Sequence, residues 1–315
     1  MYKSFRENFK YLDIPDITNQ IFLVVISVFS IIFVSSLSEK FFITLVNIVL
    51  CLLITYFVSH YEKKPVENKT ERSVSRFLRF WYPGFMILVC FKEIYIIMMS
   101  LDHGLYDTIL LNIDYWLFGV NPTEFLSRFI NPFAVEFLQI VYGLFYIMMI
   151  VYGMELYLWH RYEELKYAIF VVFFGFYLSF IGYVLVPAIG PRFSLHNFQM
   201  IGTELPGIFF ADKIRYLIDI GESIPRNVSN PEAFAQRDAF PSGHTIVMIL
   251  ITYLSHKIRS KSFYFYLPYT LIMIFSTVYL RYHYVIDLIA AIPFVLITIF
   301  VANLLYKGKI TFGKK

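Results

Sequence analysis

The chain has 315 residues, of which 58% are hydrophobic, 20% aromatic and only 16% charged, and its mean hydropathy is +0.62. Charged residues make up about a quarter of a soluble domain, so this composition excludes an ordinary soluble protein and indicates an integral membrane protein. The formal net charge of +4 is too small to indicate a nucleic-acid partner. Cys51 and Cys90 both fall inside apolar runs, so we expect no disulfide framework.

Long apolar runs predict an all-α fold built from helices that cross a membrane. A spanning helix needs about 20 mostly apolar residues. We therefore predict a polytopic membrane helix bundle with spans at residues 21–38, 41–58, 80–100, 134–158, 167–187, 242–257, 263–280 and 285–306.

Lysines and arginines predict the orientation of these spans. Most of them lie in segments on one side of the membrane, including the basic stretch between the second and third spans. Because positively charged loops stay in the cytoplasm, we expect both chain termini on the cytoplasmic side. The expected domains are an N-terminal helical hairpin with a cytoplasmic basic loop, residues 1–79, and a membrane domain, residues 80–315.

Two outer loops, residues 101–133 and 188–241, are longer than a connection between spans needs. In the first loop, apolar residues recur at helical spacing from Asp107 to Gly119, which predicts a helix lying in the membrane interface. The second loop has an amphipathic stretch from Ile208 to Ile220, which favours a partly helical lid over disorder.

Two short segments place a histidine at the mouth of an apolar helix. His244 lies in the segment Phe-Pro-Ser-Gly-His-Thr, residues 240–245, and His283 lies in Arg-Tyr-His-Tyr-Val-Ile-Asp, residues 281–287. Ionisable groups at such positions are costly and usually functional. The sixth and eighth spans both begin on the predicted outer face, so we expect the two histidines at one membrane level, where they can share one phosphate.

His283 and Asp287 are four residues apart, so they share one face at the start of a helix. A carboxylate in that position can accept the proton of one imidazole nitrogen and leave the other nitrogen free to attack. The alternative is a purely structural hydrogen bond between the two side chains.

The segment around His244 indicates different chemistry. Pro241 suits the first turn of a helix, and Ser242 and Gly243 leave backbone N–H groups open, which makes an anion site. His244 in that turn can donate a proton to a leaving oxygen. The alternative is a helix cap beside a buried histidine.

Bound phosphate also requires fixed positive charge, for which arginine offers a planar fork of donors. Arg192 follows the fifth span on the outer side and is the first candidate, and Arg281 is the second. Arg237 is a weaker candidate because Asp238 beside it favours a structural ion pair. Each arginine alone is more typical of a side chain that reaches toward the membrane interface.

These segments resemble the type 2 phosphatidic acid phosphatase superfamily, which carries the motifs K-x6-R-P, P-S-G-H and S-R-x5-H-x3-D. The second motif is complete at residues 241–244. The third matches at Ser276, His283 and Asp287, with Thr277 in its arginine position. In the first motif Arg192 fits the arginine, whereas the lysine and proline positions hold Leu185 and Phe193.

Residues 100–306 are also similar to one branch of that superfamily, which includes inositol phosphorylceramide synthases and bacterial relatives. The shared patterns are P-A-x-G-P-R at residues 187–192, F-P-S-G-H-T at 240–245 and Y-x-R-Y-H-Y-x-x-D at 279–287. The stretch 113–122 is similar as well. The first two spans lie outside this resemblance.

The resemblance implies a phosphohistidine mechanism in which His283 attacks phosphorus, Asp287 orients it and His244 protonates the departing oxygen. It implies that the phosphate oxygens are held by Arg192, Arg281, Ser242 and the Gly243 N–H. It also implies that the reaction needs no metal and no other cofactor. The substrate is expected to be a lipid phosphate or phospholipid in the bilayer.

Three functions remain open. The first is a lipid phosphatase with water as the acceptor, and the second is a phosphotransferase that passes a phospho-head-group to a lipid or sugar hydroxyl. The third, a transporter or a non-catalytic scaffold, rests on Lys92 and Glu93 within the third span. The sequence names neither the donor lipid nor an oligomeric state.

Overall fold

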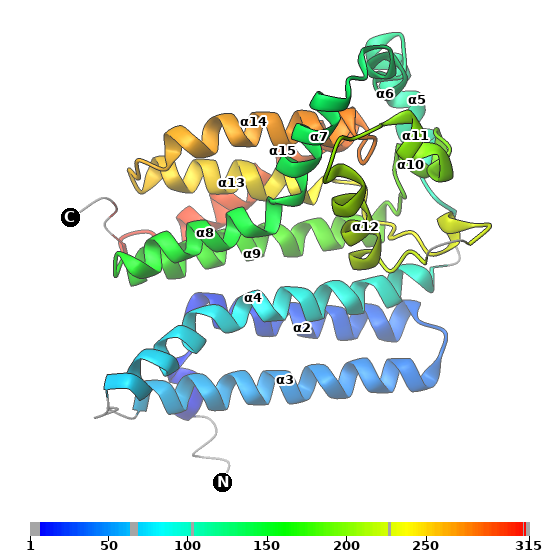
Figure 1. Cartoon of the computed structure of the whole chain (residues 1–315). Coiled ribbons are helices and arrows are strands. Elements are labelled where there is room, and N and C mark those ends of the chain that lie inside the picture. The colour runs from blue at the N-terminus through cyan, green and yellow to red at the C-terminus, as the bar shows by residue number, and fades with distance from the viewer. Residues whose placement is uncertain (1–6, 64–68, 102–103, 226–227, 311, 313–315) are drawn as a thin grey trace.

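A computed structural model describes residues 7–63, 69–101, 104–225, 228–310 and 312 (Figure 1). Within those ranges the regular structure is helical and contains no strand, which confirms the all-α prediction. The long helices run side by side as a bundle (Figure 1). They are α2 (Ile14–Phe33), α3 (Leu37–Lys63), α4 (Lys69–Met99), α7 (Pro132–Gly143), α8 (Phe145–Leu158), α9 (Tyr162–Leu185), α13 (Gly243–Lys257), α14 (Phe263–Tyr279) and α15 (Val285–Leu305).

Each predicted span coincides with one of these helices, except that the fourth is the pair α7 and α8, which meet at a bend of 48°. In the described part of the chain, five helices are long and apolar enough to cross a membrane, namely α2, α3, α4, α9 and α15, and the bent pair makes a sixth if it is one span. The helices α13 and α14 have 15 and 17 residues and fall short of that length. The structure thus supports five or six spans, and the count of eight stays a prediction.

The shorter helices gather at the end of the bundle where α13 and α15 begin (Figure 1). Both long loops are therefore partly helical, as predicted: the stretch from Asp107 forms α5, and the amphipathic stretch after Ile208 forms α12. Residues 102–103 and 226–227 of these loops lie outside the described residues. The short elements are α5 (Asp107–Phe118), α6 (Pro122–Leu126), α10 (Pro191–Ser194), α11 (Ile201–Glu204), α12 (Ala211–Gly221) and the 3-10 turns Phe9–Tyr11, Ser127–Phe129, Phe198–Met200 and Pro231–Ala233.

Helix α9 lies at the centre of the bundle and packs against α2, α4, α8, α13 and α15. Two of its glycines allow close approach. A Cβ atom on Gly175 would lie 2.5 Å from the Leu250 side chain of α13, and one on Gly182 would lie 2.4 Å from the ring of Pro241. Small residues at helix interfaces permit such contacts in membrane bundles. The backbone of α9 thereby fixes the position of the Pro-Ser-Gly-His segment.

A buried ion pair joins the N-terminal helices at the opposite end of the bundle. The Arg79 guanidinium of α4 lies 2.8–2.9 Å from the Asp16 carboxylate of α2 and 3.0 Å from that of Asp13. Arg79 and Asp16 are both buried. Because a charge removed from water needs a partner, this pairing fixes α4 against α2.

Candidate active site

The two motif histidines meet at the end of the bundle that carries the short helices. The His244 ring, in the first turn of α13, and the His283 ring, in the connection between α14 and α15, have centroids 5.7 Å apart and planes inclined by 65°. The structure thus brings together the two segments that the sequence singled out, at a separation that one phosphate group can bridge.

His283 is held through one ring nitrogen. Its Nδ1 lies 2.9 Å from the carbonyl oxygen of Ala239 and 3.2 Å from the Asp287 carboxylate. A carbonyl oxygen only accepts hydrogen bonds, so Nδ1 carries the proton and Nε2 carries the lone pair. Burial lowers the pKa of His283 to about 4, although Asp238 and the Ala239 carbonyl oppose that shift. At neutral pH His283 is therefore an uncharged imidazole with a free Nε2.

Asp287 connects the two histidine segments. Its side chain accepts from the Tyr284 N–H at 2.9 Å, and its backbone carbonyl accepts from the Ser242 N–H at 3.1 Å. The residue is fully buried. Asp287 thus orients His283 and also ties the start of α15 to the start of α13.

The Pro-Ser-Gly-His turn begins α13. The Ser242 hydroxyl oxygen accepts from the Thr245 N–H at 3.3 Å and from the Thr245 hydroxyl at 3.0 Å, which caps the helix. In both contacts Ser242 accepts, so its own hydroxyl proton remains available to donate. Gly243 has no room for a side chain, because a Cβ atom there would lie 2.3 Å from the hydroxyl oxygen of Tyr183.

The His244 ring lies among aromatic rings. Its centroid is 4.8 Å from the Tyr142 ring, in a stacked arrangement, and 4.4 Å from the Phe145 ring. Tyr142 in turn stacks on Tyr282 with ring centroids 4.1 Å apart. These contacts come from α7, α8 and the α14–α15 connection, and they fix the plane of the imidazole.

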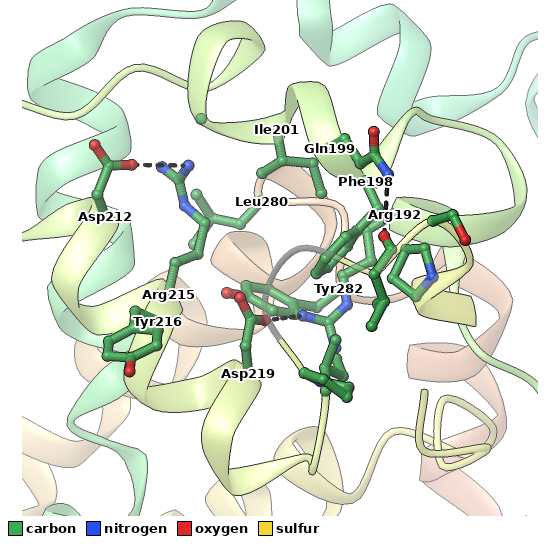
Figure 2. Close-up of a pocket in the computed structure, with 16 residues that line it drawn as sticks. Arg192, Phe198, Gln199, Ile201, Asp212, Arg215, Tyr216, Asp219, Leu280 and Tyr282 are labelled. Carbon is green, nitrogen blue, oxygen red and sulfur yellow. Dashed lines mark hydrogen bonds and ion pairs between the residues drawn. The ribbon is translucent and has the colours of Figure 1, made fainter. Parts of the chain in front are cut away.

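Arg192 supplies the positive charge of this site. It is close enough to act electrostatically on both histidines. Its guanidinium lies over the Tyr282 ring, 4.8 Å from the centroid. The same guanidinium contacts the Glu222 carboxylate. It also lies 3.4 Å from the Asp219 carboxylate (Figure 2). In this conformation the donors of Arg192 are already engaged by carboxylates at the end of α12.

A wide cavity adjoins Arg192. It has a volume of about 810 Å³ and is bordered by Tyr282, by residues of α12 and by the segment that precedes α12 (Figure 2). Its polar groups include the ion pair of Arg215 with Asp212, whose atoms are 3.2 Å apart, and the amide of Gln199. The cavity is large enough for a polar group bigger than a phosphate.

Comparison with known proteins decides the family. A sequence profile of the PAP2 superfamily matches residues 108–301, which is more than half of the chain. The chain belongs to the PAP2 superfamily. A PA-phosphatase related-family protein of Dictyostelium discoideum is 29% identical over 202 residues, which cover 58% of this chain and 33% of that protein. This chain thus spans about a third of the length of that relative. No solved structure matches the chain.

The PAP2 match confirms the superfamily resemblance and leaves α2, α3 and α4 outside it. The two histidines, Asp287 and Arg192 all lie within the matched residues.

In this PAP2 protein the side chains of the other two candidate arginines, Arg281 and Arg237, contact groups other than the two histidines. The Arg281 guanidinium contacts Glu204 and donates to the Ser127 hydroxyl at 3.0 Å, and it lines a separate cavity beside His196. Its backbone carbonyl accepts from the Arg192 N–H at 3.0 Å, so Arg281 supports Arg192 through the main chain.

Arg237 has a structural partner other than the one its sequence suggests. Its guanidinium donates to the Met98 carbonyl at 2.8 Å and to the Leu101 carbonyl at 3.3 Å, at the end of α4. Cations are favoured at helix C-termini, where carbonyl groups lack partners. Arg237 therefore donates hydrogen bonds to carbonyl groups at the end of α4, in place of the expected ion pair with Asp238.

Two carboxylates of α5 position the segments that carry His283 and Arg192, and sequence reasoning missed both. Asp114 accepts from the Val285 and Ile286 N–H groups at 2.7 and 2.8 Å, which caps α15 just after His283. Asp107 accepts from the Ile189 and Gly190 N–H groups at 3.0 and 2.8 Å, just before Arg192. The available signal was their spacing of seven residues, which places both on one face of a helix.

Asp238 is a third acidic residue near the histidines, and the sequence interpretation considered it only as an ion-pair partner of Arg237. It lines a small cavity together with His244 and Gly243. Burial, followed by the nearby Glu222 carboxylate, raises its pKa to about 7, against the opposing effects of His283 and Arg192.

The residues behind the transporter hypothesis take structural positions. Lys92 is exposed, and its ammonium donates to the Gly221 carbonyl at 3.1 Å and to the Ser223 hydroxyl at 3.0 Å. It therefore connects α4 to the segment after α12. Glu93 of α4 is buried, and its carboxylate interacts with the Asn47 side chain of α3.

Proposed function

We propose that this protein is an integral membrane lipid-phosphate phosphatase or phosphotransferase that works through a phosphohistidine at His283. The observation that carries the proposal is the hydrogen bonding of His283. Its Nδ1 is fixed by Ala239 and Asp287, and its free Nε2 belongs to a ring 5.7 Å from the His244 ring. A nucleophile oriented by a carboxylate and placed beside a second imidazole is the arrangement that covalent phosphoryl transfer requires.

In the first step the Nε2 lone pair of His283 attacks phosphorus, and the bond from phosphorus to the lipid oxygen breaks. His244 delivers a proton to that oxygen, which leaves as an alcohol. Arg192, the Ser242 hydroxyl and the Gly243 N–H stabilise the charge on the remaining phosphate oxygens. In the second step an acceptor oxygen attacks phosphorus, and His283 regains its lone pair. Water is the default acceptor.

The test uses purified protein in detergent with phosphatidic acid as substrate. We expect release of inorganic phosphate and a labelled phosphoenzyme that is stable in base and labile in acid, as a phosphorus–nitrogen bond is. His283→Ala should abolish both signals. His256→Ala is a matched control, because His256 is exposed near the opposite end of α13. Full activity of the His283→Ala protein would sink the proposal.

Transfer to a hydroxyl acceptor, as in the inositol phosphorylceramide synthase-like branch, is the second candidate function. The cavity of about 810 Å³ beside Arg192 favours it, because hydrolysis of a phosphate monoester requires no space of that size. The two functions differ in product. A hydrolase releases phosphate from a lipid phosphate without added alcohol, whereas a transferase forms product only when an acceptor alcohol is present.

We infer that the site faces the non-cytoplasmic side of the membrane. The support is the distribution of lysines and arginines, which lie mainly in segments at the other ends of the helices. Labelling of a single cysteine placed at the exposed Glu232, with a reagent that does not cross membranes, tests this orientation in intact cells. Labelling that occurs only after the membrane is permeabilised would contradict the proposed orientation.

A further inference from the structure

The first step of the proposed reaction requires a proton donor. A lipid alkoxide is a poor leaving group, so its departure requires a proton from the protein. The Nδ1 proton of His283 is held by Ala239 and Asp287. Nδ1 is not the nitrogen that attacks phosphorus, so its proton does not face the leaving oxygen. The neighbours of the His244 ring are the rings of Tyr142, Phe145 and His283. Arg192 is close enough to act electrostatically on His244. The site therefore needs another group that holds a proton at neutral pH.

Asp238 is an acidic side chain placed for that role. It lines the same cavity as His244. This cavity has a volume of about 40 Å³ and is also lined by side chains of α4, α8 and α9. This volume has room for about one water molecule, which can relay a proton. The other lining side chains are apolar or aromatic, among them Phe145, Tyr146, Phe176, Phe180 and Tyr183.

The main chain fixes Asp238 in this position. The N–H of the next residue, Ala239, donates to the Ala188 carbonyl at 3.0 Å, and the carbonyl of Ala239 accepts from His283. The residue that holds the nucleophile is thus the immediate neighbour of Asp238. The backbone at Asp238 is therefore held beside Ala188 and next to the residue that contacts His283.

The surroundings of Asp238 favour the protonated form near neutral pH. Burial is the main cause of its raised pKa of about 7, and the Glu222 carboxylate adds to it, while His283 and Arg192 act in the opposite direction. The titratable and charged groups that face Asp238 from the surrounding elements are Tyr142, Tyr146, Tyr183, Arg192, Glu222, His244 and His283.

We propose that Asp238 is a third acid–base group of this site and holds the proton that reaches the leaving oxygen through His244. The proposal rests on the phosphohistidine mechanism. As the phosphorus–oxygen bond breaks, His244 gives one ring proton to the lipid oxygen and takes one from the Asp238 carboxyl through a water molecule in the cavity that both residues line. The products are an alcohol, a phosphohistidine and an Asp238 carboxylate. When water attacks in the second step, its proton returns by the same route.

The experiment compares two leaving groups by the rate of phosphoenzyme formation in a single turnover. Phosphatidic acid releases an alkoxide that needs a proton, whereas p-nitrophenyl phosphate releases a phenolate that does not. For Asp238→Asn we expect a loss of about 100-fold or more with phosphatidic acid. With p-nitrophenyl phosphate the rate should change less than about threefold, because acid catalysis contributes little to that leaving group.

A pH profile is the second readout. In the unmodified protein the rate with phosphatidic acid should fall as pH rises through about 7, where Asp238 loses its proton. In Asp238→Asn this decline should disappear, and Asp238→Glu should restore part of both the rate and the decline. Glu232→Gln is the matched control, because it neutralises an exposed acid in the same loop.

The outcomes separate this inference from the proposed function. Equal losses with both substrates, or an unchanged pH profile, would show that Asp238 has a structural role only. No labelled phosphoenzyme in the unmodified protein would overturn the phosphohistidine mechanism itself. A normal rate with p-nitrophenyl phosphate also shows that the Asp238→Asn protein is folded.

Discussion

The guanidinium of Arg192 contacts the carboxylate of Glu222, so the positive charge beside the two histidines is already paired with the segment that follows α12. Asp219 of α12 approaches the same guanidinium to 3.4 Å. A phosphate group that binds Arg192 must displace or share these carboxylate contacts. Substrate binding is therefore coupled to the position of α12, which forms part of the outer loop predicted to act as a lid.

Removal of the Glu222 charge should strengthen phosphate binding. For Glu222→Gln we expect the inhibition constant of orthovanadate, a phosphate analogue, to fall about tenfold, because an ion pair that competes for Arg192 is lost. The measurement is inhibition of phosphate release from phosphatidic acid, with Glu232→Gln as control. An inhibition constant that rises would mean that Glu222 helps to bind the phosphate.

The same substitution should shift the pH dependence. The Glu222 carboxylate raises the pKa of Asp238, so its removal lowers that pKa. If protonated Asp238 is required, the decline in rate that we expect near pH 7 should move to lower pH in Glu222→Gln. Rates of phosphoenzyme formation from about pH 5 to about pH 9, on both sides of the expected decline, measure the shift. A shift to higher pH would contradict the assignment.

Asp114 should control the position of His283 from a distance. It accepts two N–H groups in the first turn of α15, and loss of such a cap costs about 1–2 kcal/mol. We expect Asp114→Ala to lower the melting temperature and to reduce kcat by more than tenfold, because Val285 is two residues from the nucleophile. Glu124→Gln, at an exposed position of α6, is the control. Unchanged kcat in Asp114→Ala would show that Asp287 alone orients His283.

The long helices and the meeting of the two histidines could be predicted from the sequence. Apolar runs of sufficient length define the helices. Successive helices run in opposite directions, so the chain leaves one end of the bundle along α13 and comes back to it along α14. Only the two antiparallel helices α13 and α14 lie between His244 and His283 along the chain. Their end-to-end order places the two histidines together whatever the packing of the side chains.

The groups that the arginine side chains contact could not be predicted from the sequence in the same way. Arg281 is two residues from His283 in sequence, yet its backbone has φ = +69°, which is uncommon for a residue with a side chain. Its guanidinium lies instead against Glu204. The roles of Asp107 and Asp114 were also hidden, because their partners lie far along the chain in segments with no shared pattern.

The protonation state of His283 gives a prediction for acidic conditions. Burial lowers its pKa to about 4, so it stays uncharged and nucleophilic at pH values above that point. Phosphoenzyme formation from p-nitrophenyl phosphate should therefore persist at pH 5 to 6, about where an exposed histidine becomes protonated. As pH falls through about 4, protonation of Nε2 should abolish labelling. Loss of labelling near pH 6.5, about the value of an unperturbed imidazole, would show that Nε2 is exposed to water.

Gly243 and Tyr183 should form a compensating pair. A Cβ atom on Gly243 would lie 2.3 Å from the Tyr183 hydroxyl oxygen, so Gly243→Ala must displace either the start of α13 or the tyrosine. We expect Gly243→Ala to reduce kcat about tenfold or more, because overpacking of this kind typically costs 1–3 kcal/mol, and His244 is the next residue.

The double variant tests that explanation. Tyr183→Phe removes the oxygen that the new methyl group would meet, so Gly243→Ala combined with Tyr183→Phe should recover much of the lost kcat. Gly84→Ala is the control, because a Cβ atom at that position in α4 meets no atom within 4 Å. If the double variant is no more active than Gly243→Ala alone, the defect arises in the α13 backbone itself. In that case the loss of kcat would come from displacement of the Gly243 N–H, to which we assign a contact with the phosphate.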